Sequence, residues 1–270
     1  MRFLYVAPRY HTNQVPIIRG LKRKGHEVCF LSQYAGKVED YSDLTPTVIG
    51  YSGFFLFFDR IYVALMKNRD AYAGDRKMKC GFPPIGKLKR AIRDSHGDVA
   101  ILRERSVYSI CAYLLCKKYK IPAILYNQSP LWEDCIKNDP AHRLMRLLTP
   151  TVRMTPVMGV QDGRKVKEPG AAFVPFVMEP EQKAEEKRWI KDGITHIFSI
   201  GKYEERKNHR MLVEIVEELS AVYNIHLTIA GERTTSAHQA YYDRLAAYIA
   251  DHGLQDRVTL LVNLNRQQVA

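Results

Sequence analysis

The stretch Phe198-Ser-Ile-Gly-Lys-Tyr-Glu-Glu-Arg-Lys-Asn208 says more about the fold than any other part of the sequence. It continues an apolar run, residues 195–200, that predicts a buried strand ending at Gly201. Lys202 and Lys207 follow, and a helical pattern begins where the stretch ends. Free N–H groups, a helix dipole and two ammonium groups would converge there, so a diphosphate is the ligand we expect. A solvated loop with ordinary surface lysines is the alternative.

The residues after this stretch predict strands that alternate with helices. The predicted helices are 208–223 and 241–249, and the further strands are 226–230 and 258–262. Gly253 is a plausible C-cap for the second helix. Strands that are almost continuously apolar, joined by helices, are typical of a parallel sheet. Ligands of such sheets bind at the carboxyl ends of the strands, where Gly201 and Gly231 both fall.

The first half of the chain predicts a second α/β unit. Its predicted strands are 2–7, 28–31, 99–102, 122–126, 153–156 and 172–174, and its clearest helices are 15–24 and 106–119. The chain therefore reads as α/β with two Rossmann-like domains, the second one incomplete. We expect an N-terminal domain over residues 1–177, a charged linker over 178–193 and a C-terminal domain over 194–270.

Three segments carry a family resemblance. Residues 201–208 (Gly201-Lys202-x-x-x-x-Lys207-Asn208), residues 227–231 and residues 253–258 together resemble the nucleotide-sugar domain of the retaining glycosyltransferases of family 4, which have the GT-B fold. The resemblance implies that Lys202 and Lys207 hold the donor diphosphate. Lys202 stands where the family more often has Arg. The two-pronged hydrogen bonding of a guanidinium to the phosphate would then be replaced by a single ammonium charge. It also implies that the backbone near Gly231 and Asn263 lies beside the nucleotide.

The N-terminal strand–loop–helix–strand unit is similar to the first βαβ unit of the same enzymes, although its loop, residues 8–14, lacks the usual glycines. We expect polar side chains of this loop, His11 and Asn13, to contact the acceptor instead, and a simple turn role for His11 is the alternative. Arg103 and Glu104 occupy the place of a polar residue that lines the family's cleft. A surface ion cluster is the alternative for this pair, and no catalytic residue can be named.

The resemblance implies transfer of a hexose from a nucleotide-sugar to an acceptor hydroxyl, with retention and with no metal or other cofactor. Family members continue with a further helix, strand and loop, whereas this sequence ends at residues 266–270. We therefore expect a fragment or truncated product with an incomplete donor site and no activity of its own. Two alternatives stay open: a GT-B nucleotide-sugar epimerase, which needs a carboxylate acid/base pair, and a non-catalytic module that binds nucleotide or a membrane.

Composition bears on the compartment and the partners. The five cysteines among 270 residues are scattered without a CxxC pair, which is typical of reduced thiols in a cytoplasmic protein. No apolar run approaches the roughly 20 residues of a membrane span. The net charge of +12 suits an anionic partner, but no nucleic-acid module is recognisable, so we expect no nucleic-acid partner.

One segment favours a membrane surface. Gly53-Phe-Phe-Leu-Phe-Phe58 is followed by further apolar residues and by basic residues, among them Lys67, Arg69, Arg76, Lys77 and Lys79. Aromatic residues beside cations suit an interfacial helix, and a core helix flanked by a solvated loop is the alternative. The interfacial interpretation predicts a peripheral protein at the inner face of the membrane, with a glycolipid, a lipopolysaccharide precursor or another glycan precursor as acceptor.

Overall fold

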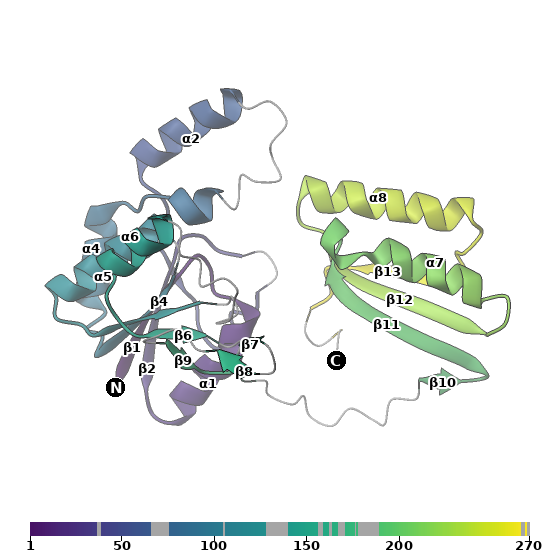
Figure 1. The fold of residues 1–270 in the computed structure, drawn as a ribbon, viewed down its shortest axis with the longest axis horizontal. Coiled ribbons are helices and arrows are strands. Elements are labelled where there is room, and N and C mark those ends of the chain that lie inside the picture. The colour runs from purple at the N-terminus through teal and green to yellow at the C-terminus, as the bar shows by residue number, and fades with distance from the viewer. Residues whose placement is uncertain are drawn as a thin grey trace. The chain divides into compact units, whose positions relative to one another are not determined.

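The structure is a computed structural model that describes residues 1–36, 39–65, 76–104, 106–127, 140–155, 159–161, 164–166, 171–175, 177, 189–265 and 268. The chain divides into two compact units, Met1–Glu179 and Pro180–Ala270, each with its own sheet (Figure 1). Most of the predicted linker, residues 178–188, lies outside the described residues. At the end of the predicted linker, Ile190–Lys191 forms a short strand, β10.

Unit 1 is built on a seven-stranded parallel sheet with the order β3-β2-β1-β4-β5-β6-β9. Its strands are β1 (Arg2–Ala7), β2 (Glu27–Ser32), β3 (Thr47–Val48), β4 (Val99–Arg103), β5 (Ala123–Tyr126), β6 (Arg153–Thr155) and β9 (Ala171–Phe173). The strand order reverses between β1 and β4, as in doubly wound folds. A small hairpin, β7 (Gly159–Gln161) with β8 (Arg164–Val166), stands apart from this sheet.

Side chains of the central strands alternate between two hydrophobic cores, one on each face of this sheet. Leu4 and Val6 of β1 pack in one cluster, and Tyr5 and Ala7 pack in the other. The helices of unit 1 are α1 (Val15–Arg23), α2 (Gly53–Leu65), α4 (Ile85–Asp94), α5 (Val107–Lys118) and α6 (Pro140–Leu148), with a 3-10 turn, η1 (Thr12–Gln14). Among the described residues, no helix is long and apolar enough to cross a membrane.

Unit 2 has the predicted order of three parallel strands and two helices. Its elements are β11 (Ile194–Lys202), η2 (Glu205–Lys207), α7 (His209–Leu219), β12 (Ile225–Glu232), α8 (Ser236–Asp251) and β13 (Val258–Val262), with β10 antiparallel at the start of β11. Both helices cover the same face of the sheet (Figure 1). The predicted stop at Gly201 is wrong by one residue, since β11 and β12 pair through Gly201↔Gly231 to Lys202↔Glu232.

Tyr203 anchors the core of unit 2 and explains why residue 231 is a glycine. The Tyr203 side chain is fully buried, and its hydroxyl lies 3.0 Å from the Ile229 carbonyl oxygen and 2.8 Å from the Leu261 carbonyl oxygen. A Cβ atom on Gly231 would lie 2.3 Å from the edge of the Tyr203 ring. No real side chain tolerates that approach, so only glycine lets the ring lie across the end of β12.

His209, the first residue of α7, is buried against Tyr203 and Tyr241, with ring centroids 5.6 and 6.3 Å apart. Its Nε2 lies 3.0 Å from the Lys202 carbonyl oxygen and must donate to it. Its buried Nδ1 has no hydrogen-bond partner among the described residues. Burial lowers the pKa of His209, and the nearby Lys207 lowers it further, although the bond to Lys202 acts the other way. The imidazole is therefore neutral at pH 7.

We expect Gly231→Ala to destabilise unit 2 by about 1–3 kcal/mol, the usual cost of an overpacked core. The ring cannot swing away, because the two carbonyls hold its hydroxyl and Tyr242 packs edge-on against it at 5.0 Å. The measurement is the opening free energy of β12 amides by hydrogen exchange. Gly20→Ala in α1, where an added Cβ meets nothing within 4 Å, is the control and should be neutral or stabilising. Unchanged exchange in Gly231→Ala would contradict this packing.

We also expect the stability of unit 2 to fall as the pH drops below 6.5, the ordinary pKa of histidine. The unfolded chain then binds a proton that the folded state, with its lowered pKa, resists, so the free energy of unfolding decreases with acidification. His209→Gln keeps an N–H donor for Lys202 but cannot titrate, and should lose part of this pH dependence. Urea unfolding at pH 7 and pH 5 compares the two proteins, and parallel decreases would disprove a buried neutral His209.

Candidate active site

The carboxyl ends of β11, β12 and β13 bring together the residues that the sequence assigned to a donor site. Gly201 pairs with Gly231, and Gly231 pairs with the last residue of β13, directly before Asn263. Lys202 closes β11, and Lys207 closes the 3-10 turn that leads into α7. The structure therefore places all five predicted residues at one edge of the sheet of unit 2.

The Lys207 side chain lies against the end of β11. A Cβ atom on Gly201 would lie 3.2–3.3 Å from three carbons of the Lys207 stem, so the stem crosses the backbone of this glycine. The residue that turns the chain is Asn208, with φ 49° and ψ 40°, a left-handed conformation that Asn tolerates well. Gly201 thus serves close approach, whereas Asn208 makes the turn. Lys207 is exposed, so its ammonium group can meet a ligand from solvent.

Lys202 is held by a carboxylate. Its Nζ lies 3.5 Å from Glu232 Oε2, across the last pair of the β11–β12 ladder. The other Glu232 oxygen accepts a hydrogen bond of 2.7 Å from the Thr234 hydroxyl. The Lys202 side chain remains 38% exposed, so the ion pair positions the cation at the site without burying it. Glu232, which the sequence reasoning missed, weakens the positive field that an anion would meet there.

The N-terminus of α7 faces the same edge, but its N–H groups are not all available. The Arg210 N–H donates to the Tyr241 hydroxyl at 3.3 Å. The Asn208 side chain does not cap the helix backbone, and its amide instead lies 3.5 Å from the Met211 sulfur. The helix dipole therefore still acts at this edge, although one of the expected N–H donors is already used.

Asn263 closes the other side of the edge. Its φ of 52° is left-handed, its N–H bonds the Gly231 carbonyl at 2.9 Å, and its side chain makes a reciprocal pair with the Arg233 backbone at 2.7 and 3.2 Å. The Asn263–Arg233 hydrogen bonds and the contacts of the Tyr203 ring hold the ends of β12 and β13 in place. Sequence reasoning missed both roles, because the partners of Asn263 and Tyr203 are 26 to 58 residues away in the chain.

The predicted acceptor loop of unit 1 is a structured turn. The His11 N–H donates to Gln14 Oε1 at 2.9 Å, and His11 Nδ1 lies 3.3 Å from the Asn13 N–H. Gln14 in turn donates to the Tyr126 hydroxyl at 2.7 Å, which ties the loop to the end of β5. His11 therefore has at least the turn role that the sequence left open, and both predicted residues lie beside the carboxyl ends of the central strands.

Arg103 and Glu104 lie at the end of β4 in two different environments. The Arg103 guanidinium lies 5.2 Å from the centre of the Tyr126 ring. Glu104 accepts hydrogen bonds from Arg153 Nε at 2.7 Å and from Asn127 Nδ2 at 3.0 Å. The Arg153 and Glu104 side chains are only 10% and 9% exposed. The alternative of a surface ion cluster is thus wrong for Glu104, which forms a buried ion pair with Arg153 that holds β4, β5 and β6 together.

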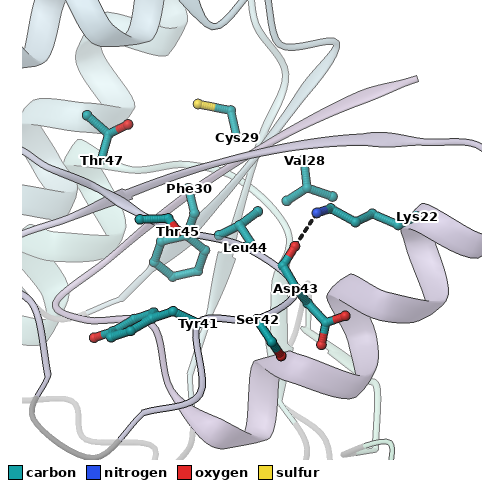
Figure 2. A pocket seen from close by; sticks show the side chains of 10 residues that line it. All are labelled: Lys22, Val28, Cys29, Phe30, Tyr41, Ser42, Asp43, Leu44, Thr45 and Thr47. Atoms are coloured by element: carbon teal, nitrogen blue, oxygen red, sulfur yellow. Dashed lines mark hydrogen bonds between the residues drawn. The ribbon is translucent and has the colours of Figure 1, made fainter.

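A hollow of about 490 Å³ in unit 1 was not predicted. It lies along the first half of β2, between the end of α1 and residues 41–47, and Figure 2 shows its lining. The Lys22 ammonium donates to the Asp43 carbonyl, and Arg19 holds the Asp43 carboxylate at 3.0 Å. Its charged lining residues, Lys22 and Asp43, are engaged with each other or with Arg19. We therefore do not assign the chemistry to it.

Comparisons with known proteins agree with the geometry of unit 2. The family of group 1 glycosyl transferases matches residues 181–270. No curated protein matches the chain. Solved structures resemble it over nearly its whole length, at identities that indicate the fold alone.

One of these structures is a glycosyltransferase from Rickettsia africae, with 13% identity, a TM-score of 0.58 and coverage of 99% of this chain and 69% of that one. Another, titled trehalose-6-phosphate from E. coli bound with UDP-2-fluoro glucose, has 12% identity, a TM-score of 0.61 and coverage of 100% and 75%. A third, Anabaena HepE in complex with UDP and glucose, has 10% identity, a TM-score of 0.56 and coverage of 97% and 69%.

The sheet topology of both units agrees with the fold of these structures. The candidate site of unit 2 lies within the residues that match the family. Residues 181–270 therefore match the group 1 glycosyl transferase family, and the chain as a whole has the GT-B fold.

Proposed function

We propose that the chain binds a nucleotide-sugar through unit 2, and that the protein transfers the hexose to a hydroxyl group with retention of configuration and without a metal ion. The observation that carries the proposal is the position of Lys207, whose stem crosses Gly201 beside the N-terminus of α7. Two of the similar solved structures contain UDP or a UDP-sugar, which supports a nucleotide diphosphate as the ligand of this fold.

The chemistry needs positive charge where the diphosphate leaves. As the bond from the anomeric carbon to the diphosphate breaks, negative charge grows on the phosphate oxygens. Lys207, Lys202 and the α7 dipole supply preorganised positive charge at one edge, which is the role a metal ion plays elsewhere. In this proposal the acceptor oxygen bonds to the anomeric carbon on the face that the diphosphate leaves. The acceptor proton passes to the departing phosphate.

The proposal includes a cytoplasmic site of action and a glycan or glycolipid acceptor. The four described cysteines are free thiols, one of them exposed, which supports a reducing compartment.

Two carboxylates beside the predicted sites are already engaged in ion pairs, Glu232 with Lys202 and Glu104 with Arg153. Neither the epimerase nor the non-catalytic module is favoured by the family match.

We expect Lys207→Ala and Lys202→Ala each to weaken diphosphate binding by about 1.5–3 kcal/mol, roughly ten- to hundredfold in Kd. Each removes one charged donor from the phosphate oxygens. Lys202→Ala should have the smaller effect, because Glu232 already offsets its charge. The measurement is calorimetric titration of the chain with UDP and, in parallel, GDP, in buffer that contains EDTA.

Two control variants sharpen this test. Lys191→Ala removes an exposed lysine of the same unit that pairs with Ile194 at the opposite end of β11, and should leave the affinity unchanged. Glu232→Gln removes the carboxylate beside Lys202 and should keep or raise the affinity. The proposal is wrong if neither nucleotide binds the unmodified chain, if both lysine variants bind normally, or if binding appears only when Mg²⁺ replaces EDTA.

A further inference from the structure

Helix α2 of unit 1 turns its apolar face outward. Five of its apolar residues, Phe54, Phe57, Phe58, Ile61 and Leu65, here called the outer face, are 74, 60, 51, 42 and 76% exposed. At about 100° per residue these positions fall within an arc of about 100° on one side of the helix. A surface helix of a globular domain normally buries such a stripe. The core-helix interpretation of this segment is therefore wrong.

The opposite side of α2 holds its one buried residue, the charged Asp59. The Asp59 carboxylate accepts from Arg76 Nε at 3.1 Å and lies 3.3 Å from Lys77 Nζ. Arg76 also stacks over the Tyr62 ring, 4.2 Å from its centre. These contacts fix the rotation of the helix. They turn the charged residue inward and leave the aromatic rings to pack on one another, with Phe54 and Phe58 4.8 Å apart.

Apart from Asp59, the charged residues in the described segments 53–65 and 76–82 are basic. Arg76 and Lys77 already neutralise Asp59. The remaining cations, Arg60 and Lys79, are exposed. The Ser52 N–H donates to the Phe82 carbonyl at 2.8 Å, so the basic segment is attached at the start of the helix. Figure 1 shows α2 as the outermost helix of unit 1, on the far side of α4 and α5 from the sheet.

We propose that α2 docks unit 1 onto an anionic lipid bilayer, with the outer face in the interfacial layer and Arg60 and Lys79 among the lipid phosphates. Exposed aromatic side chains next to cations match both layers of such a surface. A second copy of the chain would bring like charges together, and a neutral apolar surface would leave the cations without partners. The docking itself does not depend on the donor site in unit 2, whereas its consequence, an acceptor at a membrane, rests on the proposed function.

The test is flotation of the full chain with vesicles on a density gradient, because bound protein rises with the vesicles whereas aggregates sink. Vesicles of phosphatidylcholine alone are compared with vesicles that contain phosphatidylglycerol. We expect flotation with the anionic vesicles only, and weaker flotation as NaCl rises from 0.1 M, where the Debye length is about 10 Å. Equal flotation with both kinds of vesicle, or none, would overturn the proposal.

Substitutions assign the binding to α2. The double variant Phe54→Gln with Leu65→Gln changes only exposed positions and should lower vesicle partitioning at least about tenfold. Val222→Gln, at a position 76% exposed in unit 2, is the matched control and should bind like the unmodified chain. Lys79→Glu should weaken binding to the anionic vesicles. Normal flotation of the double variant would refute the assignment, as would self-association in the absence of lipid that this variant abolishes.

Discussion

The pairing of Gly201 with Gly231 is the constraint on which the candidate site depends. Parallel pairing brings the two residues side by side at the carboxyl edge, and neither carries a Cβ atom. The missing atom on Gly231 leaves room for the Tyr203 ring, and the missing atom on Gly201 leaves room for the Lys207 stem. A side chain at either position would displace an aromatic anchor or a cation. The two glycines therefore make room for the core of unit 2 and for the candidate phosphate site.

The first unit uses the corresponding edge in a different way. Gln14 bonds Tyr126, and Glu104 bonds Arg153 and Asn127, so polar side chains at the strand ends largely satisfy one another. A buried ion pair of this kind is costly to break, since either partner alone would leave an unpaired charge. This edge consequently pairs polar side chains with one another where the sequence suggested groups available to an acceptor. In unit 2, by contrast, Lys207 is left exposed beside a helix N-terminus.

The sequence predicted the order of strands and helices, because apolar runs and helical spacing are local signals. It also predicted the glycine that ends α8, since Gly253 follows that helix with a left-handed φ of 66°. It missed the reason for Gly231, because the Tyr203 ring reaches it only after the sheet has formed. It could not orient α2 either. An aromatic run has the same sequence pattern in a core helix and in an interfacial helix. The Asp59–Arg76 ion pair sets the orientation of α2, and its partners are 17 residues apart.

The central claim is that the anion site lies at the paired glycines of unit 2. Amide chemical-shift mapping of the isotope-labelled chain during a titration with UDP tests it most directly, because each backbone N–H reports its own surroundings. The account predicts that the largest shifts occur at residues 201–210 and 231–233, where Lys207 and the start of α7 meet the edge of the sheet. Shifts centred on the hollow beside β2, or none in unit 2, would contradict it.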